Sequence, residues 1–140
     1  MIGVAGSCHC GNIRVEFNLA RAPETYNVRV CDCEFCRRHS PAYVSDQQGF
    51  LVVNISDIGR TSRYRQGRAL ADFLLCRNCG VLVAVLFEDA GEIFAVVNAK
   101  TVDGGVTFGP EQRISPKMLS DAEKVARWRS IWFPNVRLVV

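Results

Sequence analysis

The sequence has no long apolar run, no large net charge and no low-complexity segment, and each absence excludes a class of protein. Its longest apolar run, residues 81–87, is far shorter than the roughly 20 residues of a membrane-spanning helix. No charged segment followed by an apolar stretch opens the chain, so we expect no signal peptide and a cytoplasmic protein. The net charge of +3 is too small to indicate nucleic-acid binding. We therefore expect neither a membrane nor a nucleic acid as partner.

Most of the sequence predicts β-strands. Ile13, Val15 and Phe17 alternate with polar residues, and residues 26–30 repeat this pattern directly before a cysteine. Further apolar or β-branched runs predict strands at 50–55, 71–75, 81–87 and 93–97, with a hairpin turn at 88–91. Short strands at this spacing favour antiparallel sheets over βαβ units. With 140 residues, we expect one mainly β domain spanning residues 1–140.

Two helices interrupt this pattern. A short helix is expected over 34–40, because the following proline would end it. Ser120 and Glu123 form a capping box, which predicts a C-terminal helix over 121–132. Three apolar residues share one face of that helix by their spacing: Trp128, Ile131 and Trp132. This face either docks on the sheet or forms an aromatic lid over a ligand.

Arginine dominates the basic residues, and four arginines fall within residues 60–68. A guanidinium binds carboxylates and phosphates bidentately, so this segment is a candidate cradle for an anionic ligand. The alternative is a solvated hairpin whose exposed positions carry the charge.

All seven cysteines lie in three short clusters: Cys8 and Cys10; Cys31, Cys33 and Cys36; Cys76 and Cys79. Their number is odd, and a bridge within a Cys-x-Cys segment would be a strained ring. In a reducing compartment such spacings favour metal over disulfides. Zinc is the expected metal, with iron as the alternative because sites made only of thiolates accept it.

The seven cysteines divide into a group of four and a group of three. Cys10 and Cys79 each precede a glycine, which permits the backbone turn in which amides point at metal-bound sulfurs. The predicted structural zinc therefore has four ligands: Cys8, Cys10, Cys76 and Cys79. Cys31, Cys33 and Cys36 leave one position open, as in catalytic zinc sites.

His39 is a candidate fourth ligand for the group of three. It is equally a candidate acid or base, or an ordinary surface residue. Asp32 and Glu34 flank Cys33 and are either solvated or involved in proton transfer. His9, between two predicted ligands, is expected to point away from the metal.

Three stretches, residues 6–11, 31–38 and 73–80, resemble the motifs of the glutathione-dependent formaldehyde-activating enzyme family, which includes the centromere protein V domain. Residues 101–103 resemble a late element of the same family. The resemblance covers residues 3–115 and leaves 116–140 as a C-terminal helix and tail. It implies an Mss4-like fold of zinc-stapled antiparallel sheets with two zinc ions per chain, the group of four structural and the group of three catalytic.

The resemblance also implies a carbon–sulfur lyase of the S-(hydroxymethyl)glutathione synthase type, which joins glutathione to formaldehyde or a related small aldehyde. Three thiolates make the metal a weak Lewis acid, so activation of the thiol is favoured over polarisation of the carbonyl. Arg37, Arg38 or residues 60–68 are candidates to bind the carboxylates of glutathione. His39 or Glu34 are candidates to move the proton.

A second function remains open, because fold alone does not fix function. The chain would then be a non-enzymatic zinc-binding module for protein partners, which would tolerate a closed three-cysteine site and expose an apolar patch. An unpaired edge strand would also allow a homodimer.

Overall fold

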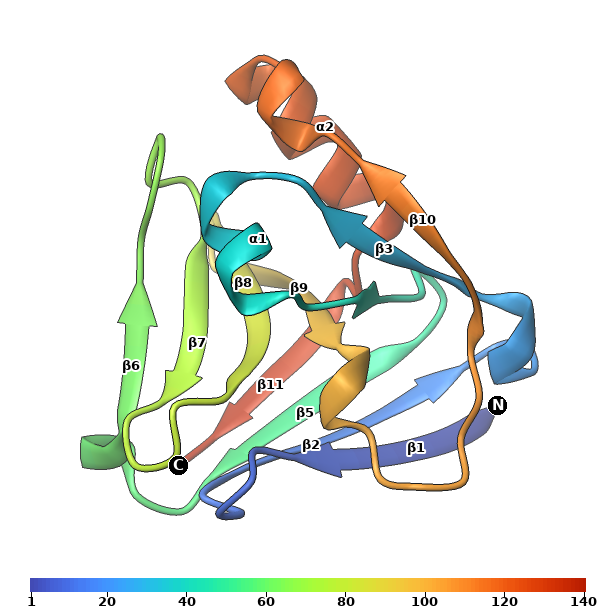
Figure 1. Ribbon diagram of the computed structural model, residues 1–140, viewed down its shortest axis with the longest axis vertical. Coiled ribbons are helices and arrows are strands. Elements are labelled where there is room, and N and C mark those ends of the chain that lie inside the picture. The colour runs from blue at the N-terminus through green and yellow to red at the C-terminus, as the bar shows by residue number, and fades with distance from the viewer.

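The computed structural model describes residues 1–140 and contains two β-sheets and two α-helices (Figure 1). The strands are β1 Ile2–Ser7, β2 Ile13–Leu19, β3 Asn27–Cys31, β4 Tyr43–Val44, β5 Phe50–Ile55, β6 Thr61–Tyr64, β7 Asp72–Cys76, β8 Leu82–Asp89, β9 Glu92–Asn98, β10 Gly109–Ile114 and β11 Asn135–Val139. The helices are α1 Glu34–His39 and α2 Asp121–Ile131. Short 3-10 turns occupy Pro23–Thr25, Ile58–Arg60, Ala99–Thr101 and Pro116–Met118.

The strands form a four-stranded sheet, in the order β1-β2-β5-β11, and a seven-stranded sheet, in the order β10-β3-β4-β9-β8-β7-β6. The expected mainly β fold with a C-terminal helix is confirmed. The sheets are not purely antiparallel, however, because β10 pairs parallel to β3 and β11 pairs parallel to β5. Both strands lie after residue 108, where the sequence predicted only a helix. β10 is mostly exposed on both faces and lacks the apolar alternation that signals a strand.

The main core lies between the two sheets. In β2 the apolar residues predicted to point inward are buried, and the intervening Arg14 and Glu16 are exposed. β8 is buried along most of its length, because one of its faces packs in this core and the other packs under the helices. A strand covered on both faces reads as a continuous apolar run, as residues 81–87 do.

A second apolar cluster covers the other face of the seven-stranded sheet and includes residues of α1 and α2. α1 ends at His39, the capping residue Ser40 adopts φ 54°, and the following Pro41 cannot continue the helix. The capping box at the start of α2 is present as predicted. The predicted Trp128 face docks on the sheet, where the Trp128 ring lies 5.2 Å from that of Phe87. No helix is long and apolar enough to cross a membrane.

Candidate functional site

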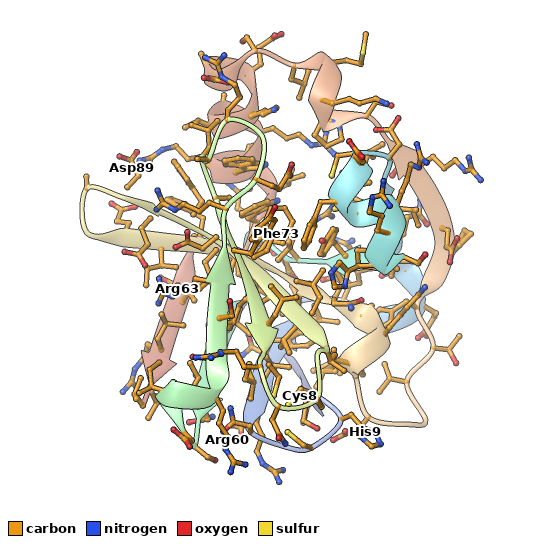
Figure 2. The ribbon with its side chains drawn as sticks, turned by 60° about the vertical axis from the view of Figure 1, so that its left-hand side comes forward. Cys8, His9, Arg60, Arg63, Phe73 and Asp89 are labelled. Atoms are coloured by element: carbon orange, nitrogen blue, oxygen red, sulfur yellow. The ribbon has the colours of Figure 1, made fainter.

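Four cysteines from opposite ends of the first 80 residues meet at two hairpin turns, and we refer to them as the four-cysteine cluster: Cys8, Cys10, Cys76 and Cys79. The first pair lies in the turn between β1 and β2; of the second pair, Cys76 ends β7 and Cys79 lies in the turn before β8. These hairpins belong to different sheets, so the cluster joins the two sheets. Figure 2 places Cys8 and His9 at the end of the molecule opposite α2.

Backbone geometry explains why the cysteines of each turn converge. Gly11 and Gly80 adopt φ +84° and +82°, a conformation that side chains disfavour. The turns direct amides at the sulfurs: Ile13 N donates to Cys8 Sγ at 3.3 Å, and Cys79 N donates to Cys76 Sγ at 3.5 Å. The four cysteines grouped by their neighbouring glycines are therefore the four whose sulfurs lie together.

The second group, the three-cysteine cluster, consists of Cys31, Cys33 and Cys36. Cys31 is the last residue of β3, and Cys33 is the N-cap of α1, whose sulfur accepts a hydrogen bond from Cys36 N at 3.4 Å. Cys36 is buried within α1, and its Sγ lies 3.4 Å from the hydroxyl of Tyr43. A strand end and the first turn of the next helix thus bring three sulfurs together within six residues.

Thiols packed this closely cannot all ionise without a cation. Hydrogen bonds from Cys31 and Cys36 lower the pKa of Cys33 to about 2. The hydrogen bond with Cys33 raises the pKa of Cys31 to about 11. Hydrogen bonds with Cys31 and Cys33 raise the pKa of Cys36 still further. One thiolate is therefore favoured and the other sulfurs keep their protons. A bound metal would displace these protons, so metal binding and proton release are coupled.

Both clusters fit zinc. All seven cysteines are free, and within each cluster the sulfurs lie within 4.8 Å of one another. A tetrahedral zinc with bonds of about 2.3 Å places its sulfurs about 3.8 Å apart. The Cys8–Cys10 and Cys10–Cys76 sulfur pairs are separated by 3.8 and 3.5 Å. The four-cysteine cluster thus offers a complete tetrahedral donor set, and the three-cysteine cluster offers one donor fewer.

A cavity of about 270 Å³ lies beside the three-cysteine cluster. All three of its cysteines line the cavity, whereas none of the four-cysteine cluster does. The apolar walls come from both sheet and helix: Tyr43, Phe73, Val85 and Val96, with Trp128 and Trp132. This volume is close to the lower end of small-molecule pockets, about 300 Å³.

Every charged side chain that lines the cavity is basic: Arg29, Arg68, Lys117, Lys124 and Arg127. Two of them are paired with carboxylates that do not line it. Arg68 lies 3.2 Å from Asp121, and Lys117 lies 3.8 Å from Asp32. The other three form no ion pair. These three basic side chains therefore meet no carboxylate in the cavity, and the Cys33 thiolate is the negative group that lines it with them.

No sequence motif includes Arg29, but the two-residue repeat of a strand places it beside the three-cysteine cluster. It precedes Cys31 by two residues on β3, so both side chains project from the same face. Arg29 is half-buried and donates a hydrogen bond to Ser45 Oγ at 2.6 Å. Burial and the nearby charge of Arg127 lower its pKa to about 10, which leaves it protonated at neutral pH.

The other predicted site residues lie outside the cavity. His39 is exposed, and its ring packs 4.6 Å from that of Phe35, not against the three-cysteine cluster. Arg37 and Arg38 are exposed on α1, where Arg38 pairs with Glu34. Asp32 accepts a hydrogen bond from the Ser115 hydroxyl at 2.5 Å, which ties the cluster loop to the end of β10. His9 is exposed and is not among the clustered residues, as expected.

Residues 60–68 were expected either to bind an anionic ligand or to form a solvated hairpin, and the structure shows a part of the segment in each place. β6 forms a hairpin with β7, and Arg63 and Arg65 pair with Asp72. Figure 2 shows Arg63 on the outer side of this hairpin. Only the loop beyond β6 reaches the cavity, through Gln66, Gly67 and Arg68. The solvated hairpin therefore describes most of the segment, and its tip alone lines the site.

The fold and these two clusters define a mainly β protein with two candidate thiolate metal centres, one enclosed between hairpins and one open to a basic cavity. The family profile described as glutathione-dependent formaldehyde-activating enzyme matches residues 3–119. The chain belongs to this family. The match extends slightly past the expected residue 115 and ends just before α2.

A solved structure has a similar fold. The crystal structure of a Rhodobacter sphaeroides protein is similar to this chain with a TM-score of 0.58 and 26% sequence identity. The similarity covers 77% of this chain and 99% of that chain. Among curated proteins, none matches this chain.

Proposed function

We propose that this protein is a zinc-dependent carbon–sulfur lyase of the S-(hydroxymethyl)glutathione synthase type. It joins a thiol, with glutathione as the first candidate, to formaldehyde or a related small aldehyde. The thiol sulfur forms a bond to the carbonyl carbon, the carbonyl π bond breaks, and the thiol proton passes to the oxygen. The reverse reaction releases the thiol and the aldehyde.

One observation carries the proposal: the three-cysteine cluster lines the cavity, and the four-cysteine cluster does not. We assign Cys31, Cys33 and Cys36 to the catalytic zinc and the four-cysteine cluster to a structural zinc. When bound by three thiolates, zinc supplies an open position in which a thiol loses its proton at neutral pH. Family membership supports the thiol and aldehyde substrates.

Other residues of the chain hold and enclose the reactants. Tyr43 is buried, and burial raises its pKa well above the usual range, so its hydroxyl keeps a proton to donate to Cys36 Sγ. Gln66 Nε2 lies 3.8 Å from Cys33 Sγ. The apolar wall formed by Phe73, Trp128 and Trp132 excludes water from the carbon that the thiol attacks.

The proposal is tested by Cys33→Ser, with zinc content and turnover measured on the same preparation. Exchange between free glutathione and its hydroxymethyl adduct, followed by NMR in the presence of labelled formaldehyde, separates catalysis from the spontaneous reaction. We expect a folded variant with about half the zinc and no catalysed exchange, because one of two metal sites has lost a ligand. His39→Ala is the matched control and should keep wild-type zinc and exchange, because its ring lies away from the cluster.

Unchanged exchange in the folded Cys33→Ser variant would reject the lyase assignment. Wild-type protein with two zinc ions but no catalysed exchange would favour the alternative, a non-enzymatic zinc module for protein partners. The accessible three-cysteine cluster supports the enzyme, because a purely structural ion needs no cavity beside it.

A further inference from the structure

The positive charge that lines the cavity exceeds the single negative charge of the three-cysteine cluster, whether that cluster holds one thiolate or three thiolates with a zinc ion. Arg29, Lys124 and Arg127 line the cavity and form no ion pair, and no aspartate or glutamate lines it. Removing charge from water is costly unless the charge is paired, so proteins rarely leave such groups without a partner. A cluster of this kind beside a candidate reactive centre points to a charged ligand of opposite sign.

Arg29 is held in a fixed orientation. It lies opposite Tyr43 in the pairing of β3 with β4, and directly opposite residues project to the same face of a sheet. Its guanidinium donates to Ser45 Oγ, and the Ser45 hydroxyl in turn donates to the backbone carbonyl of Ile131 at 2.7 Å. Ser45 is buried, so this chain of hydrogen bonds connects Arg29 to the C-terminal end of α2. The guanidinium is therefore positioned by neutral groups, which leave its charge available.

α2 contributes the other two unpaired positive charges that line the cavity. Lys124, Arg127 and Trp128 lie on one face by their i, i+3 and i+4 spacing, and all three line the cavity. α2 is also fixed in place from both sides, because Arg68 pairs with Asp121 and Arg129 pairs with Asp89. The match to the family profile ends at residue 119, so this face is a feature of the present chain beyond the matched segment.

We propose that Arg29 and Arg127 form an anion subsite that binds a carboxylate of the thiol substrate while its sulfur faces the three-cysteine cluster. The inference names the substrate class of the same site and rests on the proposed function. A planar guanidinium matches a carboxylate through two parallel hydrogen bonds. Trp128 and Trp132, stacked with ring centroids 4.8 Å apart, contact the apolar part of the ligand between the two ends. The site thus selects acidic thiols over neutral or cationic thiols of the same size.

The subsite is tested without turnover by calorimetric titration of the zinc-loaded protein with S-methylglutathione and with its diethyl ester. The methyl group blocks the thiol, and the ester removes both carboxylate charges. We expect the ester to bind wild-type protein roughly 30-fold or more weakly, the range found when one member of a buried charge pair is lost. Arg29→Met and Arg127→Met should each bind the acid as weakly as the ester.

Arg68→Met is the matched control, because Arg68 lines the same cavity but is already paired with Asp121 and exposed. It should keep the preference for the acid. Equal binding of acid and ester by wild-type protein would overturn the proposal, even if Arg29→Met failed to fold. Competition by inorganic phosphate that is stronger than competition by acetate would also overturn it, because the subsite would then bind phosphate.

Thermal unfolding without ligand distinguishes a binding residue from a structural one. Arg29→Met should unfold at the same temperature as wild type or higher, because it removes an unpaired charge from a half-buried position. A clear fall in unfolding temperature, with the preference for the acid retained, would assign Arg29 a structural role instead.

Kinetics separate this inference from the lyase assignment. If exchange is catalysed, Arg29→Met should raise KM for 3-mercaptopropionate and leave KM for 2-mercaptoethanol unchanged, because only the first carries a carboxylate. If no exchange is catalysed while S-methylglutathione still binds with the predicted charge preference, the lyase assignment fails and the anion subsite stands.

Discussion

The sulfur atoms of Cys10 and Cys76 lie 3.5 Å apart, although 66 residues separate them in the sequence. The two residues lie at the tips of hairpins in different sheets, so a metal bound here would close a long loop of the unfolded chain. A metal site that forms only in the folded state contributes its binding free energy to folding. A metal at the three-cysteine cluster would close no long loop, because its three cysteines lie within six residues of one another.

Cys76→Ser should therefore be more destabilising than Cys33→Ser. We expect each variant to lose one zinc, and Cys76→Ser to lose several kcal/mol of unfolding free energy because its metal connects distant segments. Metal analysis and urea unfolding of both variants measure the two effects. Equal losses of stability would contradict the assignment of a structural role to the four-cysteine cluster.

Gly6 should tolerate no side chain. A Cβ added at Gly6 would lie 2.4 Å from the carbonyl oxygen of Thr101, because β1 passes directly against residues 101–103 at this point. We expect Gly6→Ala to lower the unfolding free energy by about 2 kcal/mol or more through this overpacking. Gly3→Ala on the same strand meets no atom within 4 Å and should be nearly neutral. Thermal unfolding of both variants decides the matter, and comparable stabilities would disprove the close contact.

Asp46 should give the protein a pH-dependent stability in the acid range. Burial raises the pKa of this carboxyl, but hydrogen bonds from Ala20 N, Tyr26 Oη and Gln48 N outweigh burial and place it below the usual 3.8. A lowered pKa means that the contribution is complete above pH 4 and is lost as the pH falls through the folded value. Asp46→Asn should cost about 1–3 kcal/mol near pH 7, and less below pH 4.

Urea unfolding of wild type and Asp46→Asn at pH 7, 5 and 3.5 measures this difference. Glu92→Gln serves as the control, because Glu92 is exposed and forms no ion pair, so its difference from wild type should stay near zero at each pH. An Asp46→Asn difference that did not change with pH would show that the charge of Asp46 is unimportant.

Tyr43→Phe should weaken metal binding at the three-cysteine cluster alone. The hydroxyl of Tyr43 lies 3.4 Å from Cys36 Sγ, and groups that hydrogen-bond to a metal ligand typically change affinity about 10-fold or more. Competition with a graded series of chelators should show earlier release of one of the two zinc ions. Tyr64→Phe, whose exposed ring stacks on Phe35, should leave both release steps unchanged. Identical release curves for Tyr43→Phe and wild type would rule out this contact.

Residues whose roles depend on near neighbours were predicted well. Local backbone preference explains four of these features: the alternation in β2, the capping box of α2, the turn between β8 and β9, and the end of α1 just before Ser40. The division of the cysteines followed from a count and from two glycines whose positive φ the structure confirms. Each of these signals is contained within a few consecutive residues.

The candidate residues that lie outside the cavity were chosen because they are close to the three-cysteine cluster in sequence, and closeness in sequence does not fix where a side chain points. Arg37 and Arg38 directly follow Cys36, but a helix places successive residues on different faces, and both point to solvent. Arg29 lies further from Cys36 in the sequence, yet the two-residue repeat of a strand puts it on the same face as Cys31.

The sequence by itself determined the candidate metal donors, their grouping and most of the strands, because cysteine spacing, glycine turns and apolar alternation are properties of short segments. Only the tertiary structure decided what surrounds the open cluster. The parallel pairing of β10 with β3 and the docking of α2 bring residues 114–132 beside Cys31, and long-range packing of this kind leaves no local pattern to read. The chemistry of the cavity, basic on one side and aromatic on another, arises from that packing.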